Sequence, residues 1–153
     1  MIVNPDFSDF VEILNRNEVE YVVVGAFALA FLGYPRATGD IDFWIRPTVP
    51  NARAVLQAVD DFGFGSLGLT QEDILSGKIV QMGRPPVRID LLTDLDGVTA
   101  EEIWSSRREG PFGRHSVFYL GKDTFLKNKR ASGRKKDFVD LDLFSKPKKR
   151  KKS

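Results

Sequence analysis

Residues 21–45 read YVVVGAFALAFLGYPRATGDIDFWI and predict a strand, a helix and a second strand. The β-branched run before Gly25 is typical of a buried strand, and the glycine ends it. An apolar helix is expected over 26–32, because the glycine and proline just behind it cannot continue a helix. Polar and apolar residues then alternate at the start of 40–45, which predicts the second strand.

Two carboxylates stand at the start of that second strand. Asp40 and Asp42 share one face of it, with Cβ atoms roughly 6–7 Å apart, because side chains alternate along a strand. Acidic residues are uncommon in strands, and their mutual repulsion is costly in a cleft of low dielectric constant. A divalent cation would relieve this repulsion, and Mg²⁺ accepts carboxylate oxygens together with phosphate oxygens and water.

Asp90 adds a third carboxylate inside an apolar strand predicted over 87–92, where it shares a face with Arg88. If this strand neighbours the strand of Asp40, three carboxylates converge. Such a set serves two-metal phosphoryl chemistry, in which one carboxylate can take the proton of the attacking hydroxyl. Gly25 supplies a phosphate site beside them, because a helix N-terminus presents free backbone N–H groups.

Each of these features also has a purely structural interpretation. An Asp-x-Asp pair at a strand edge is often solvated and paired with Arg or Lys, and a glycine after a strand usually makes a turn. Asp90 could pair with Arg88. The functional interpretation depends on the occurrence of all three features together at fitting distances.

The rest of the chain alternates between helical and extended patterns. Helices are expected over 5–15, 52–62, 70–75, 99–107, 123–131 and 134–144, and further strands over 79–82, 87–92 and 116–120. This order predicts a mixed α/β or α+β domain with one sheet and helices packed against it. Residues 1–145 are expected to form this single domain.

Composition excludes several classes of protein. The chain has 153 residues, no cysteine and one histidine, His115. Disulfide scaffolds, cysteine-based zinc sites and thiol nucleophiles are therefore excluded. No apolar run reaches the ~18–20 residues of a membrane span, and the first residues lack the basic region of a signal peptide. A cytoplasmic protein without a membrane partner is expected.

Charge is distributed unevenly along the chain. Residues 146–153 carry six positive charges, whereas residues 1–126 hold 11 basic and 18 acidic residues, a net charge of −7. The acidic body argues against a general nucleic-acid binder and suits a site that collects carboxylates around metal ions. The tail 146–153 is expected to be disordered and could add salt-dependent affinity for RNA.

The motifs together resemble the nucleotidyltransferase superfamily, whose members have the polymerase β-like fold. In that family a hydrophobic residue, Gly and Gly or Ser precede an Asp-h-Asp/Glu-h motif, and a third acid follows; here these are 24–26, 40–43 and Asp90. The similarity is closest to a minimal prokaryotic branch that includes the AbiEii-type toxins. That branch carries an Arg-x-Thr-x-Asp lead-in, here from Arg36, and a Lys-x-x-x-Gly-Arg-x-x-Asp-x-x-Asp element, here 129–140.

The resemblance covers roughly residues 7–145 and implies roles for individual residues. Asp40, Asp42 and Asp90 are expected to hold Mg²⁺, and Asp90 also to act as the general base. The residues expected to contact the nucleotide are Gly25, Ala26, Arg36, Lys129 and Arg134. Asp137 is expected to orient the last two or to contribute to the site. Ala26 stands where the family has Gly or Ser, so a hydroxyl is missing while the backbone N–H remains.

The function implied is Mg²⁺-dependent transfer of a nucleoside monophosphate from an NTP to a hydroxyl of RNA, a protein or a small molecule. The alternative is an inactive nucleotidyltransferase-like module that binds a nucleotide or RNA, or that forms half of a toxin–antitoxin pair with a partner protein. A third interpretation is RNA binding driven by the tail 146–153.

Overall fold

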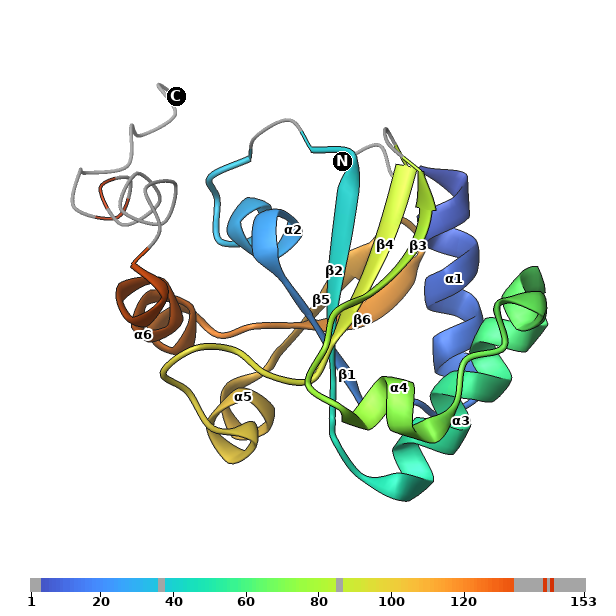
Figure 1. Ribbon diagram of the computed structural model, residues 1–153. Coiled ribbons are helices and arrows are strands. Elements are labelled where there is room, and N and C mark those ends of the chain that lie inside the picture. The colour runs from blue at the N-terminus through green and yellow to red at the C-terminus, as the bar shows by residue number, and fades with distance from the viewer. Residues whose placement is uncertain (1–3, 36–37, 85–86, 134–141, 143, 145–153) are drawn as a thin grey trace.

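The computed structural model describes residues 4–35, 38–84, 87–133, 142 and 144. Its centre is one mixed six-stranded sheet with the strand order β3-β4-β2-β1-β6-β5 (Figure 1). The strands are β1 (Tyr21–Val24), β2 (Asp40–Ile45), β3 (Val80–Arg84), β4 (Val87–Leu92), β5 (Arg108–Phe112) and β6 (His115–Tyr119). The predicted α+β class with a single sheet is confirmed.

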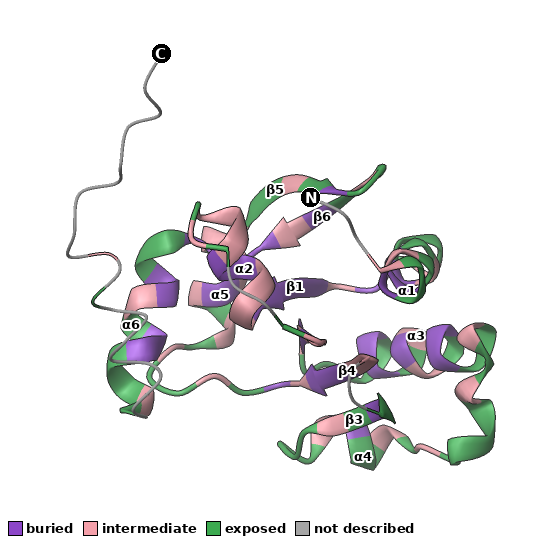
Figure 2. Ribbon diagram, turned by 90° about the horizontal axis from the view of Figure 1, so that it is seen from above, coloured by how far each residue is buried: buried purple, intermediate pink, exposed green. Residues whose placement is uncertain are grey.

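The α-helices in the described part of the chain pack around the sheet: α1 (Pro5–Arg16), α2 (Gly25–Phe31), α3 (Val49–Val59), α4 (Gln71–Leu75), α5 (Ala100–Ser106) and α6 (Lys122–Ser132). Two short helical turns, η1 (Asp60–Phe64) and η2 (Gly65–Leu67), follow α3. In both overall views α1 and α3 lie on one side of the sheet, and α2, α5 and α6 lie on the other (Figures 1 and 2). No helix in the described part of the chain is long and apolar enough to cross a membrane.

Alternation along β2 separates an apolar face of the sheet from a polar one. Ile41, Phe43 and Ile45 are fully buried on one face, where the ring of Phe10 from α1 packs edge-on against Phe43 at 5.5 Å. Asp40 lies on the opposite face and is only half-buried. The buried residues therefore fill the centre of the sheet (Figure 2), while one end of β2 keeps its carboxylates accessible.

The structure corrects two sequence predictions. Helix α3 begins at Val49, not at residue 52, because Thr48 accepts a hydrogen bond from the Asn51 N–H and Pro50 lies in the first turn, where its missing N–H costs nothing. Strand β5 was not predicted at all. It forms as an edge strand through antiparallel pairing with β6.

Several predictions fall outside the described residues. These are the helix expected over 134–144, apart from residues 142 and 144, and the tail 146–153. The same holds for Arg36, Arg134 and Asp137.

Candidate functional site

Strand order brings the three predicted carboxylates together. Strands β2 and β4 are parallel neighbours, with Asp42 opposite Asp90 and Asp40 opposite Arg88. Residues that lie opposite each other point to the same face of a sheet, so all four side chains share the polar face. The convergence that the sequence made conditional on strand order is therefore present.

Arg88 joins two of these carboxylates through its guanidinium group. Its Nε donates to Asp90 Oδ1 at 2.9 Å, and its Nη2 donates to Asp90 Oδ2 at 3.1 Å and to Asp40 Oδ2 at 3.0 Å. The hydrogen bond to Asp90, with the negative charges of Asp90, Asp40 and Asp42, raises the pKa of Arg88 above its ordinary value. The side chain of Asp90 is only 8% exposed, so this pairing compensates a nearly buried charge.

Asp42 packs against the junction of β1 and α2. Antiparallel pairing places Val24, the last residue of β1, opposite Asp42, so the next residue, Gly25, meets the carboxylate. Gly25 has a φ of +65°, and a Cβ at this position would overlap Asp42 Oδ2. Glycine is therefore required at position 25 for two reasons: the left-handed backbone and the close approach of the carboxylate.

These residues line a cavity of about 500 Å³ on the polar face of the sheet. Its walls come from the β1–α2 junction, β2, β3, β4, the loop after β4 and α6. The lining residues are Val24, Gly25, Ala26, Thr38, Asp40, Asp42, Ile79, Gln81, Arg88, Asp90, Leu92, Leu95, Asn128 and Lys129. All described residues that were predicted for the site therefore lie in one cavity.

Helix α6 brings Lys129 to the cavity because the loop after β4 holds the helix. Asn128 Nδ2 donates to the Asp96 carbonyl at 3.0 Å, and a Cβ at Gly97 would overlap Ala131, so helix and loop are in close contact. Lys129 is 5% exposed. Its ammonium lies over the ring of Phe125, 5.3 Å from the centroid, so a nearly buried lysine adds a positive charge to the lining of the cavity that holds the carboxylates.

Lys127 fixes the outer side of α6 to α5 by an ion pair with Glu102, at 2.7 Å. The Lys127 hydrogen bond and, next, the Thr99 backbone N–H lower the pKa of Glu102 below its ordinary value of 4.5. A lowered folded-state pKa contributes stability above pH 4.5, and this contribution is lost as the pH falls through the folded-state value.

Glu102→Gln is therefore expected to make the stability less sensitive to acid. The urea midpoint of the variant should lie below that of the wild type at pH 7, and the two should approach each other as the pH falls below 4.5. Glu101→Gln is the control, because Glu101 pairs with Arg46 and not with α6. A constant difference between Glu102→Gln and wild type at all pH values would contradict this assignment.

The lining residues that were not predicted for the site include the polar residues Thr38, Gln81 and Asn128. Thr38 Oγ1 accepts from the Asp40 N–H at 3.2 Å, and its spacing of two residues from Asp40 was a usable signal. Gln81 lies opposite Asp90 in the β3–β4 pair, a register that depends on the length of the hairpin loop. Asn128 precedes Lys129 and carried no signal of its own.

The donor types in the cavity fit Mg²⁺, since carboxylate oxygens are its preferred protein ligands. In the structure, however, the carboxylates of Asp40 and Asp90 are hydrogen-bonded to Arg88. Among the residues that the structure describes, no group of three or more His, Cys, Asp or Glu side chains is placed to hold a metal ion.

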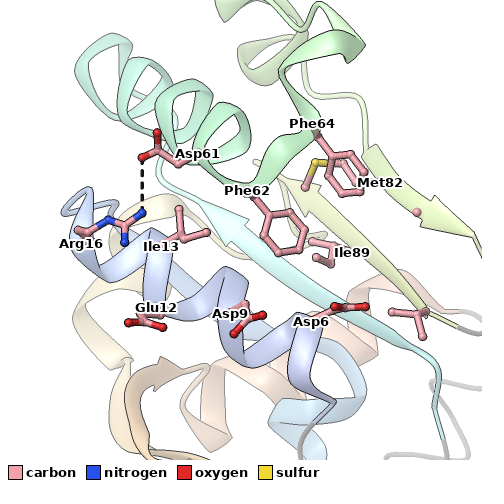
Figure 3. A pocket seen from close by; sticks show the side chains of 12 residues that line it. Asp6, Asp9, Glu12, Ile13, Arg16, Asp61, Phe62, Phe64, Met82 and Ile89 are labelled. Atoms are coloured by element: carbon pink, nitrogen blue, oxygen red, sulfur yellow. Dashed lines mark ion pairs between the residues drawn. The ribbon is translucent and has the colours of Figure 1, made fainter.

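A second hollow, of about 580 Å³, lies on the opposite face of the sheet (Figure 3). The acidic residues Asp6, Asp9 and Glu12 follow one another along α1, across from the apolar side chains of Phe62, Met82 and Ile89. Arg16 and Asp61 face each other at 3.9 Å at one end of this hollow. None of the described residues predicted for the site lines it, so the carboxylate cavity is the candidate functional site.

Comparison with solved structures shows which known folds this chain is similar to. A "putative nucleotidyltransferase" from Thermotoga maritima matches with a TM-score of 0.61 and 12% identity, over 94% of this chain and 95% of that one. The lincosamide antibiotic adenylyltransferase LnuA, solved with lincomycin bound, matches with a TM-score of 0.54 and 14% identity, over 94% and 97%. The chain has a nucleotidyltransferase-like fold. No family model matches the sequence, and neither does any curated protein.

Proposed function

We propose that this protein transfers a nucleoside monophosphate from an NTP to a hydroxyl acceptor, with release of pyrophosphate. The observation that carries the proposal is the cavity that Asp40, Asp42, Asp90, Gly25 and Lys129 line together. Acids and a cation around one hollow suit a triphosphate, whose negative charge must be balanced before its α-phosphorus can be attacked.

In the proposed reaction the acceptor oxygen bonds to the α-phosphorus, and the bond from the α-phosphorus to the bridging oxygen of the β-phosphate breaks. Asp90 would accept the proton of the acceptor hydroxyl. Lys129 would place its positive charge near the departing pyrophosphate. Mg²⁺ held by Asp40, Asp42 and Asp90 would supply further positive charge to the phosphates.

The acceptor is proposed to be a hydroxyl of RNA, a protein or a small molecule. The lincosamide adenylyltransferase LnuA has a fold of similar extent and was solved with lincomycin, which supports a small molecule. Arg36 and Arg134, which lie outside the described residues, are proposed as further phosphate ligands on the basis of the family resemblance.

A second candidate is a nucleotide-binding module without transfer activity, as a component of a toxin–antitoxin pair. Arg88 favours it, because its guanidinium already pairs with two of the three carboxylates. Ala26 favours it as well, since it lacks the hydroxyl that the family places beside the phosphates. This second proposal includes a relationship of the chain to the AbiEii-type toxins.

Calorimetric titration of each NTP, with and without Mg²⁺, tests the nucleotide site that both candidates require. Wild type is expected to bind at least one NTP in a Mg²⁺-dependent manner, and Asp40→Ala/Asp42→Ala is expected to weaken this binding at least tenfold. The control is Asp9→Ala/Glu12→Ala, which removes the same charge from the exposed face of α1, beside the other hollow. Absence of binding of every NTP to folded wild-type protein would contradict the proposal. Pyrophosphate release then separates the enzyme from the binding module.

A further inference from the structure

Arg88 uses the same carboxylate oxygens that a divalent cation would need. It stands two residues before Asp90 on β4 and opposite Asp40 on β2, so both acids lie within reach of one guanidinium. Three hydrogen bonds of 2.9–3.1 Å join it to Asp90 Oδ1, Asp90 Oδ2 and Asp40 Oδ2. The guanidinium is therefore the counter-charge of Asp40 and Asp90 in this structure.

A guanidinium and a divalent cation cannot share these oxygens in the same place. Mg²⁺ binds oxygen at 2.0–2.1 Å and demands near-octahedral geometry, whereas the guanidinium holds the carboxylates in its own plane. Arginine cannot lose its proton to reduce the repulsion. A cation that enters must therefore displace Arg88 from Asp40 and Asp90.

Displacement of Arg88 is sterically possible because the side chain lies at the cavity and is 26% exposed. A planar guanidinium pairs with phosphate in the same bidentate manner as with carboxylate. A bound triphosphate would thus give Arg88 a new partner within the same cavity.

We propose that Arg88 is an internal counter-ion, which pairs with Asp40 and Asp90 in place of a divalent cation and moves to the nucleotide phosphates when the cation binds. The phosphate part of this inference rests on the proposed function. The competition between Arg88 and the cation stands without it. Arg88 is accordingly a positioning residue that makes metal and nucleotide enter the site together.

The first test measures Mn²⁺ binding without nucleotide. Electron paramagnetic resonance reports the concentration of the free ion. Arg88→Gln is expected to bind Mn²⁺ at least tenfold more tightly than wild type, because Asp40 and Asp90 then lack their guanidinium partner. Arg84→Gln is the matched control: it removes one positive charge from an exposed position on the adjacent strand β3, outside the cavity lining, and should change the affinity little. Equal or weaker Mn²⁺ binding by Arg88→Gln would overturn the competition.

The second test is NTP binding in EDTA, where Arg88 stays on Asp40 and Asp90 and lowers the negative charge that the phosphates meet. Arg88→Gln should weaken the metal-free affinity at least threefold, opposite in direction to its effect on Mn²⁺. A purely structural arginine would shift both affinities in the same direction or neither. If no NTP binds to wild type even with Mg²⁺, the proposed function fails, and the Mn²⁺ measurement still decides the competition.

Wild-type protein gives an independent readout if Arg88→Gln does not fold. The Arg88 Nε–H proton is hydrogen-bonded to Asp90 Oδ1, so its NMR resonance should shift, and its exchange with water should accelerate, upon saturation with Mg²⁺. Arg88→Lys assigns this resonance by its disappearance. An unchanged resonance under saturating Mg²⁺ would show that Arg88 stays on Asp90, and the proposal would then be wrong.

Discussion

Asp42→Asn is expected to lower nucleotidyl transfer by about a thousandfold, the scale of effect seen when one electrostatic group of a catalytic site is removed. Asparagine keeps the shape of the side chain beside Gly25 but removes the negative charge. Asp42 also lies directly opposite Asp90, so the substitution changes the charge of the site and removes one of the proposed Mg²⁺ ligands. Pyrophosphate release from NTP, with cellular RNA or lincomycin offered as acceptor, measures the effect.

Asp9→Asn is the matched control for this experiment. It makes the same chemical change on an exposed position of α1, beside the hollow on the opposite face of the sheet, and should leave the rate within a factor of about two. Thermal unfolding of both variants should stay close to that of wild type. An Asp42→Asn protein with wild-type turnover would remove Asp42 from the reaction.

Gly25→Ala is expected to destabilise the protein by about 3 kcal/mol, as measured by urea unfolding. A left-handed backbone costs an L-residue roughly 1–2 kcal/mol, and forcing an atom into a packed place typically costs a further ~1–3 kcal/mol. The new Cβ would displace the Asp42 carboxylate, so the variant should also lose NTP binding.

Gly68→Ala separates the two contributions. Gly68 has the same φ of +65°, but a Cβ there meets no atom within 4 Å, so only the backbone cost of roughly 1–2 kcal/mol applies. Adding Asp42→Ala to Gly25→Ala should recover the difference between the two glycine variants. Equal destabilisation by Gly25→Ala and Gly68→Ala would mean that the contact with Asp42 carries no cost.

The elements with strong local signals were predictable from the sequence. Alternation along 40–45 and the capping motifs at Thr70 and Thr99 each specify a local conformation, and the structure contains the corresponding strand and both capping boxes. Strand β5 was not predictable in this way. Its residues Arg-Glu-Gly-Pro carry no strand preference, and it exists because β6 offers a pairing edge and Phe112 is buried.

Some features of the candidate site also follow from local sequence patterns, and others do not. That Asp40 and Asp42 share a face follows from the period of a strand alone. Their proximity to Asp90 depends on the order β4-β2-β1, which is set by long-range packing and not by any local pattern. The sequence left open whether Arg88 pairs with Asp90. The structure adds Asp40 to the same guanidinium, which requires the register of β2 against β4.

The central position of β1 has a consequence for folding during synthesis. All four of its residues are buried, and its outer neighbour is β6, to which it is joined by parallel pairing of Val23 with Tyr119 and by a hydrogen bond from the Leu120 N–H to the Val23 carbonyl. Until the ribosome has released the segment up to Leu120, this apolar strand has an unpaired edge. Such edges recruit strands of other chains, and pairings between distant segments form slowly. Nascent chains that stop short of β6 are therefore expected to need chaperones more than the complete chain does.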